Sequence, residues 1–192
     1  MLLAMFMFSL SMSISPGPVN LISMNTASKH GFRFSLLFVS GATLGFILLL
    51  FVVGVTGGLL STYIEQYASL LRYPGALYMI YLASLVIRSG EISDQSNSKK
   101  QGFMSGAMMQ WLNPKAWVAC LAGASGFVIG KTDLEFATFL GIYCVVCFIS
   151  IALWAWAGSL LMVKLQNRTN RQAFNFLIAI MLVLSAVSLL QG

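Results

Sequence analysis

The chain has 192 residues, of which 58% are hydrophobic and only 8% are charged, and its mean hydropathy is +0.86. A typical soluble domain is about 25% charged, so this composition excludes a water-soluble globule. It also excludes a disordered chain, which needs low hydrophobicity and high net charge. A helix needs roughly 20 apolar residues to cross a bilayer, so six crossings fit but twelve do not. We expect an all-α integral membrane protein whose single domain, residues 1–192, lies in the lipid bilayer.

Six apolar stretches follow one another along the chain, and each is long enough to span a membrane. They are Leu2–Ala27, Leu36–Leu60, Leu70–Ile87, Phe103–Ile129, Phe136–Val163 and Phe174–Leu190. The first lacks the basic start of a signal peptide and continues beyond a Pro-Gly-Pro sequence, which predicts a retained helix. The polar stretch at 88–101 indicates a linker between two halves of three helices, at about 1–90 and 101–192.

Proline interrupts the first helix of each half, at Ser15–Pro18 in helix 1 and at Asn113–Lys115 in helix 4. Because each half crosses the membrane three times, the second half enters from the opposite face, and we expect two inverted three-helix repeats. Matched broken segments in inverted repeats are the best sequence pointer to a transport site. A simple kink would explain either break alone, but two breaks at matching positions favour a site.

Lys115 is the one formally charged residue inside a predicted span, 12 residues from Phe103 and 14 from Ile129. A lysine near the bilayer centre costs roughly 2.5 to 3.5 kcal/mol on the insertion scale, which makes it a functional candidate. The alternative is that its chain snorkels to an interface. We expect Lys115 to bind an anionic group, to titrate, or to do both.

The predicted substrate-binding residues lie at or beside the two breaks. They are Ser15, Pro16, Gly17, Asn20, Asn113, Pro114 and Lys115. The polar side chains, with Gln110 beside them, have an alternative role, which is to satisfy the backbone groups that the prolines free. Trp111 and Trp117 flank the second break and fit core packing and a pocket wall equally well.

The basic residues indicate the orientation of the chain. Eight of them are expected on one side of the membrane and two, Arg72 and Lys131, on the other. The eight are Lys29, Arg33, Arg88, Lys99, Lys100, Lys164, Arg168 and Arg171. The positive-inside rule places the eight in the cytoplasm, so both termini are expected on the periplasmic side. Since these residues lie between apolar runs and form no single basic face, we expect no nucleic-acid partner.

The sequence lacks the residues that metal binding, histidine-based catalysis and binding of a cationic substrate would need. The sole histidine, His30, is expected in a loop, and all five acidic residues are expected in loops or at helix ends: Glu65, Glu91, Asp94, Asp133 and Glu135. We therefore expect no metal site, no histidine-based catalytic pair, no cofactor and no enzyme activity. Without a carboxylate inside a span, there is no counter-charge for a cationic substrate, which argues against lysine or arginine as cargo.

These residues resemble the LysE/RhtB amino-acid exporter family, small bacterial inner-membrane proteins with six apolar stretches. The resemblance covers essentially the whole chain and is carried by Ser15–Pro18, by Gly31, Gly41 and Gly45, by Gly75, Tyr78, Tyr81 and Leu82, and by Asn113–Lys115. Residues 27–33 are most similar to the cysteine and O-acetylserine exporter branch. Ala83 and Ser84 stand where members commonly carry a glycine, a departure that bears on substrate recognition.

The resemblance implies proton-driven efflux of small amino acids or their derivatives, of the cysteine, O-acetylserine, threonine or homoserine type. We predict that a zwitterion places its carboxylate against Lys115 and a half-helix N-terminus, and its ammonium against freed carbonyls and the oxygens of Ser15, Asn20 or Asn113.

Glycines recur at four-residue spacing, which suits close packing within one chain or in a homodimer.

Three alternatives remain open. A thiol-redox electron carrier would need a thiolate pair, whereas Ser15 and Asn113 precede the key prolines and the Cys144–Cys147 motif lies in an apolar run. A metal-ion exporter would need clustered histidines or acids. A purely structural membrane subunit is opposed only by the paired breaks.

Overall fold

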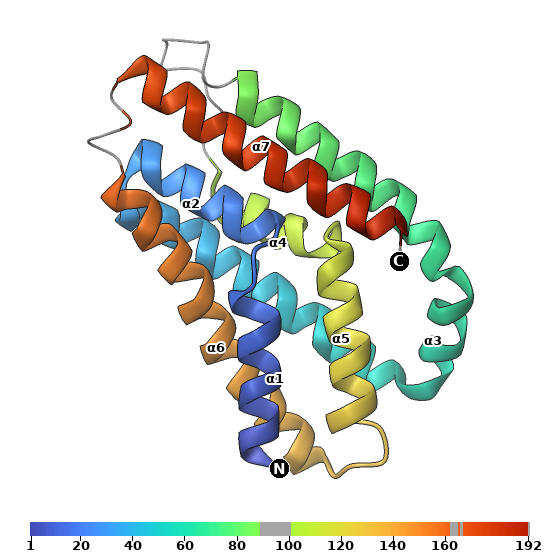
Figure 1. The fold of residues 1–192 in the computed structure, drawn as a ribbon. Helices are drawn as coiled ribbons and strands as arrows, with labels where there is room; N and C mark the ends of the chain where they lie inside the picture. Colours follow the sequence, from blue (N-terminus) through green and yellow to red (C-terminus); the bar gives the residue numbers. More distant parts are fainter. Residues whose placement is uncertain (89–100, 162–164, 166, 192) are drawn as a thin grey trace.

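The structure, a computed structural model, describes residues 1–88, 101–161, 165 and 167–191. The described residues form seven α-helices and no β-strand, which confirms the all-α prediction. The helices are α1 (Leu2–Ile14), α2 (Pro18–His30), α3 (Phe32–Arg88), α4 (Phe103–Trp111), α5 (Pro114–Phe127), α6 (Asp133–Leu160) and α7 (Arg168–Gln191) (Figure 1). The predicted linker at 88–101 lies, apart from its first and last residues, outside the described residues.

Two of the described helices are long and apolar enough to cross a membrane. They are the first part of α3, Phe32–Thr56, with a mean hydropathy of 2.7, and α6, with a mean hydropathy of 2.4. The pair α1 and α2 makes a third such span, bent by 59° at its break. These helices are those of a multi-pass membrane protein, while the arrangement as six spans in two inverted repeats stays a prediction.

Both proline breaks are present where they were predicted. α1 ends at Ile14 and α2 begins at Pro18, and α4 ends at Trp111 while α5 begins at Pro114. Each new helix has proline in its first turn, where the missing N–H costs nothing and the fixed φ suits the helix. The residue before each proline, Gly17 or Asn113, is extended, because the proline ring disfavours the helical conformation there.

The prediction of separate helices at Leu36–Leu60 and Leu70–Ile87 is wrong in one respect, because α3 covers both stretches. Figure 1 shows α3 doubling back, so that its later part runs beside α7. Between the two apolar stretches the sequence carries Glu65 and Gln66, which are good helix formers. A loss of hydrophobicity therefore does not have to end the helix.

The helix α2 lies at the centre of the bundle although it is rich in polar residues. Ten of its thirteen residues are buried. Ser23 and Ser35 are in hydrogen-bonding contact at 3.4 Å between α2 and α3, and the Asn25 amide donates to Asn175 Oδ1 of α7 at 3.0 Å. These polar side chains of α2 thus find hydrogen-bond partners on α3 and α7 in the core, as most buried polar groups do.

Glycines allow α3 and α4 to pack backbone to backbone. A Cβ atom at Gly41 would collide with the Phe103 carbonyl, one at Gly45 would lie 2.7 Å from the Ala107 backbone, and one at Gly106 would collide with the Phe38 carbonyl. The Gly41 and Gly45 spacing therefore serves packing within one chain, as small residues do at close helix crossings.

We expect Gly41→Ala to lower the melting temperature of the detergent-purified protein, because α4 must move away from α3; overpacking of this kind costs about 1–3 kcal/mol. The matched control is Gly141→Ala, since a Cβ atom there meets nothing within 4 Å and alanine is the better helix former. Equal melting temperatures for the two variants would contradict the close crossing.

Candidate functional site

Lys115 joins the two breaks, which lie about 100 residues apart in the sequence. Its Nζ donates to the Ser15 hydroxyl oxygen at 2.8 Å, to the Ser15 carbonyl at 2.9 Å and, more weakly, to the Pro16 carbonyl at 3.5 Å. A Cβ atom at Gly17 would lie 3.4 Å from Lys115 Nζ, so the absent side chain leaves room for the ammonium. The lysine therefore makes its bonds inside the bundle and does not snorkel away from the break.

The last carbonyls of α1 are satisfied by side chains from other elements. The break removes the N–H groups that would continue the helix. The Asn20 amide donates to the Ser13 carbonyl at 2.8 Å and to the Ser15 carbonyl at 3.0 Å, and the Trp154 indole N–H of α6 donates to the Ile14 carbonyl at 3.0 Å. The broken end of α1 is thus a row of carbonyl oxygens that already bind donors.

The second break is stabilised by a cap at each end. The Asn113 side chain accepts from the Lys115 backbone N–H at 3.2 Å, as an N-cap of α5. The Trp117 indole N–H donates to the Trp111 carbonyl at the end of α4 at 2.8 Å. Trp117 therefore caps a helix end, a role beyond the packing and pocket-wall functions expected for it.

The first turn of α2 supplies the opposite kind of group. Its N-cap residue Gly17 has no side chain to cap the helix, and Pro18 has no N–H. The unpaired N–H groups and the dipole of a helix N-terminus favour negative charge. The first break therefore presents carbonyl oxygens, which suit a cation, beside a helix end that suits an anion.

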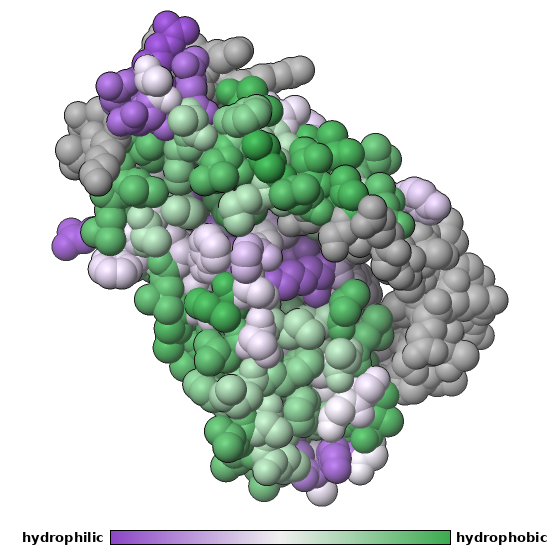
Figure 2. Space-filling view, viewed as in Figure 1, coloured by the Kyte–Doolittle hydropathy of each residue, from purple (hydrophilic) through white to green (hydrophobic). Residues whose placement is uncertain are grey.

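A small cavity of about 40 Å³ lies between these groups. Its lining includes polar residues from both breaks, namely Ser13, Gly17, Asn20, Gln110, Asn113 and Lys115. The cavity has room for a few water molecules, but it is far below the roughly 300 Å³ at which ligand pockets begin. Figure 2 shows a hydrophilic patch at this level, surrounded by hydrophobic surface. The cavity is therefore too small for an amino acid in this structure, and it is only partly enclosed.

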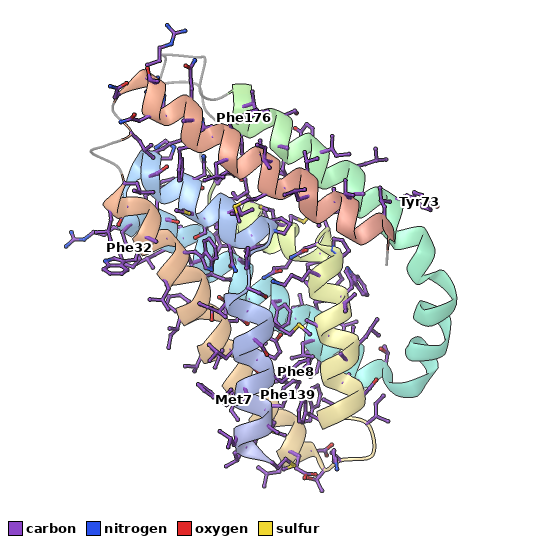
Figure 3. The ribbon with its side chains drawn as sticks, viewed as in Figure 1. Met7, Phe8, Phe32, Tyr73, Phe139 and Phe176 are labelled. Carbon is purple, nitrogen blue, oxygen red and sulfur yellow. The ribbon has the colours of Figure 1, made fainter. Side chains whose placement is uncertain are left out.

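Aromatic rings fill the space between this cavity and the N-terminal end of α1. Tyr143 and Phe46 line the cavity, with ring centroids 4.5 Å apart. Tyr143 also contacts Phe139 at 5.5 Å, and Phe139 contacts Phe127 at 5.0 Å. Phe8 of α1 packs on Phe139 at 6.3 Å (Figure 3). These rings form one packed aromatic cluster beside the cavity.

The structure brings most of the predicted site residues together. Gly17, Asn20, Asn113 and Lys115 line the cavity, and Ser15 and Pro16 accept hydrogen bonds from Lys115. Pro114 is buried in the first turn of α5 and is not among the lining residues. Their role in substrate binding stays a prediction.

Among the lining residues that the sequence analysis missed, three carry a hydroxyl or thiol group: Ser13, Tyr143 and Cys147. Ser13 was within reach of sequence reasoning, because it lies two residues before the first broken position. Tyr143 and Cys147 come from α6 and carry no sequence signal that links them to the breaks. In the described part of the chain, no group of three or more metal-binding side chains comes together.

A polytopic helical bundle whose broken helices meet around one partly buried lysine defines a membrane transport protein. The chain belongs to the LysE type translocator family, which matches residues 10–192. It is 27% identical over 190 residues to the cysteine/O-acetylserine efflux proteins of Escherichia coli (strain K12) and Shigella sonnei (strain Ss046), and the match covers 97% of this chain and 96% of each relative. No solved structure is significantly similar to it.

Removal of the Asn20 amide is expected to destabilise the first break. Asn20→Ala takes a donor from the Ser13 carbonyl and one of two donors from the Ser15 carbonyl, which keeps Lys115; an acceptor left unsatisfied in the interior costs about 1–3 kcal/mol. The variant should melt at a lower temperature than the wild type. Ser11→Ala is the control, because that hydroxyl bonds only carbonyls of its own helix at an exposed position. A Ser11→Ala effect as large as that of Asn20→Ala would contradict this role.

Proposed function

We propose that this protein exports small neutral amino acids or their derivatives from the cytoplasm through the site between the two breaks. One observation carries the proposal: the Lys115 ammonium of α5 binds the Ser15 hydroxyl and carbonyl at the end of α1. Paired broken helices that meet at one buried polar site are typical of secondary transporters. The efflux named for the relatives supports the direction and the class of cargo.

Substrate binding exchanges one ammonium for another. In the structure, the Lys115 ammonium binds the carbonyl and hydroxyl oxygens of Ser15. A zwitterionic amino acid brings a carboxylate that binds Lys115 and an ammonium that takes over the vacated oxygens. The α2 N-terminus adds donors for the carboxylate. Each charged group then has a partner before and after binding, which keeps the cost of burying charge low.

The cargo is expected to be neutral overall because the described cavity lining contains no carboxylate. A second ammonium, as on lysine, would enter beside Lys115 without a counter-charge. The small size of the cavity and its lining by Tyr143 and Phe46 also favour a short side chain. Cysteine, O-acetylserine, threonine and homoserine fit these limits.

Transport against a gradient requires coupling to an ion, because a zwitterion carries no net charge for the membrane potential to move. Lys115 is a titratable group that contacts the site directly, so release of its proton would free the Ser15 oxygens and abolish the carboxylate partner. We assign Lys115 both roles, substrate binding and coupling to the proton gradient. The protein then works as an antiporter.

The orientation follows from charge. Lys29 lies near the end of α2 and Arg168 at the start of α7, whereas Lys131 lies in the loop between α5 and α6, at the end of the molecule that holds the N-terminus (Figure 1). The positive-inside rule places the first group in the cytoplasm of a bacterial inner-membrane protein. The N-terminus is then periplasmic, the aromatic rings lie on the outer side, and the two halves form inverted repeats with the C-terminus also outside.

Lys115→Gln is expected to lower gradient-driven efflux from proteoliposomes at least about tenfold, since a hydrogen bond to a charged group contributes about 1.5–3 kcal/mol. Lys131→Gln removes the same charge from an exposed loop position and should transport like the wild type. Both variants are compared after size-exclusion chromatography, so that only folded protein is reconstituted. Full gradient-dependent efflux by Lys115→Gln would overturn both roles of this lysine.

Cells that overproduce the protein are expected to release cysteine, O-acetylserine, threonine or homoserine faster than cells that overproduce Lys115→Gln. Lysine release should be equal in the two strains, because the cavity offers no carboxylate for its second ammonium. The measurement is the extracellular amount of each amino acid, in parallel cultures. Strong lysine release that depends on Lys115 would overturn the charge argument and redefine the cargo.

A further inference from the structure

A second polar cluster, separate from the break site, lies between α2 and α7. Asn25 and Lys29 are four residues apart on α2, and Arg171 and Asn175 are four residues apart on α7, so each pair shares a helix face. The Asn25 amide donates to Asn175 Oδ1 at 3.0 Å. Since the two helices pair in opposite directions here, Lys29 lies opposite Arg171, one turn further along, and the two cations repel each other.

Two N–H donors in this cluster are buried without an acceptor. Among the described residues, neither Arg171 Nε nor Asn175 Nδ2 has a hydrogen-bond partner, and Asn175 is only 1% exposed. A buried donor without an acceptor costs about 1–3 kcal/mol, and more when it is charged. Both donors belong to the face of α7 that turns toward α2. Their shared need is a hydrogen-bond acceptor, and the positive charge of Arg171 favours an anionic one.

The helix ends near this cluster also favour an anion. Arg168 and Arg171 lie in the first turn of α7, and this turn contains no acidic residue. The N-terminus of a helix carries partial positive charge and favours anions, so these arginines add charge where the helix itself is already positive. Lys29, at the end of α2, supplies a further cation. An anion between the helices would remove the repulsion and satisfy the buried donors.

We propose that Lys29, Arg171 and Asn175 form a binding site for a phosphate oxyanion, which the phosphodiester headgroup of an anionic phospholipid supplies. Figure 2 shows hydrophilic residues gathered where α7 begins, next to hydrophobic surface. Basic pockets between membrane helices on the cytoplasmic side bind anionic headgroups in this way. The choice of a lipid rests on the orientation proposed above, whereas the need for an anion rests on the contacts alone.

The test is thermal unfolding of the protein in detergent, followed by tryptophan fluorescence, with phosphatidylglycerol, phosphatidylcholine or inorganic phosphate added. Phosphatidylglycerol should raise the melting temperature saturably, and phosphatidylcholine should not. Lys29→Gln and Arg171→Gln should each weaken the apparent affinity for phosphatidylglycerol about tenfold. Arg33→Gln is the matched control: Arg33 is an exposed cation at the same end, and its loss should leave the affinity unchanged.

The change in melting temperature of Arg171→Gln without lipid distinguishes an anion site from a structural contact of Arg171. Without added lipid, Arg171→Gln should melt at or above the wild-type temperature, because the variant has lost a repulsion. A lower melting temperature would show that Arg171 is paired structurally and would overturn the proposal. So would equal affinity for phosphatidylglycerol in all three variants, or no stabilisation of the wild type by either phosphate compound.

Saturable stabilisation by inorganic phosphate that Arg171→Gln weakens, with none by the lipid, would support the oxyanion site and assign it to a soluble phosphate. Because unfolding is measured without a transport step, failure here leaves the proposed efflux untouched, and failure of efflux leaves this site untouched.

Discussion

The hydrogen bonds from Lys115 to Ser15 hold together the two breaks on which the rest of the site depends. A lysine at membrane depth needs acceptors, and a broken helix needs donors for its last carbonyls. Each feature would be costly alone, and each supplies what the other lacks. The Lys115 ammonium lies 2.8 Å from the Ser15 hydroxyl oxygen and 2.9 Å from the Ser15 carbonyl. The same contact is where we propose that a substrate binds.

The surrounding helices lower the free-energy cost of the proposed exchange, in which Lys115 leaves Ser15 and binds a substrate carboxylate. Asn20 and Trp154 keep donors on the neighbouring carbonyls, so the break keeps its shape when Lys115 turns to a carboxylate. Glycines hold α3 against α4, and the central α2 is buried almost all round. A rigid frame with one exchangeable ammonium suits a carrier. Substrate binding then changes only the contacts of Lys115, and the other helix contacts stay as they are.

Buried or partly buried charge lies at two places, and each place suits a different kind of ligand. At the breaks, one cation faces neutral oxygens in a small cavity, which suits a zwitterion. Between α2 and α7, Lys29 and Arg171 lie near the Asn175 Nδ2 donor, which has no acceptor among the described residues, and this arrangement suits an anion. Both follow from the rule that buried polar groups need partners. In our proposals, the first site exchanges its partner during transport, and the second retains an anion at the membrane surface.

The sequence by itself determined the all-α membrane class and both proline breaks, because each depends on local composition and on the chemistry of proline, and it singled out Lys115 as a candidate. It did not determine that α3 continues through Glu65 and Gln66, since polarity alone does not end a helix. Only the tertiary structure decided that Lys115 reaches Ser15, that Trp154 caps α1 and that Tyr143 and Cys147 line the cavity. Those contacts join distant helices, and no spacing within one helix encodes how two helices pack.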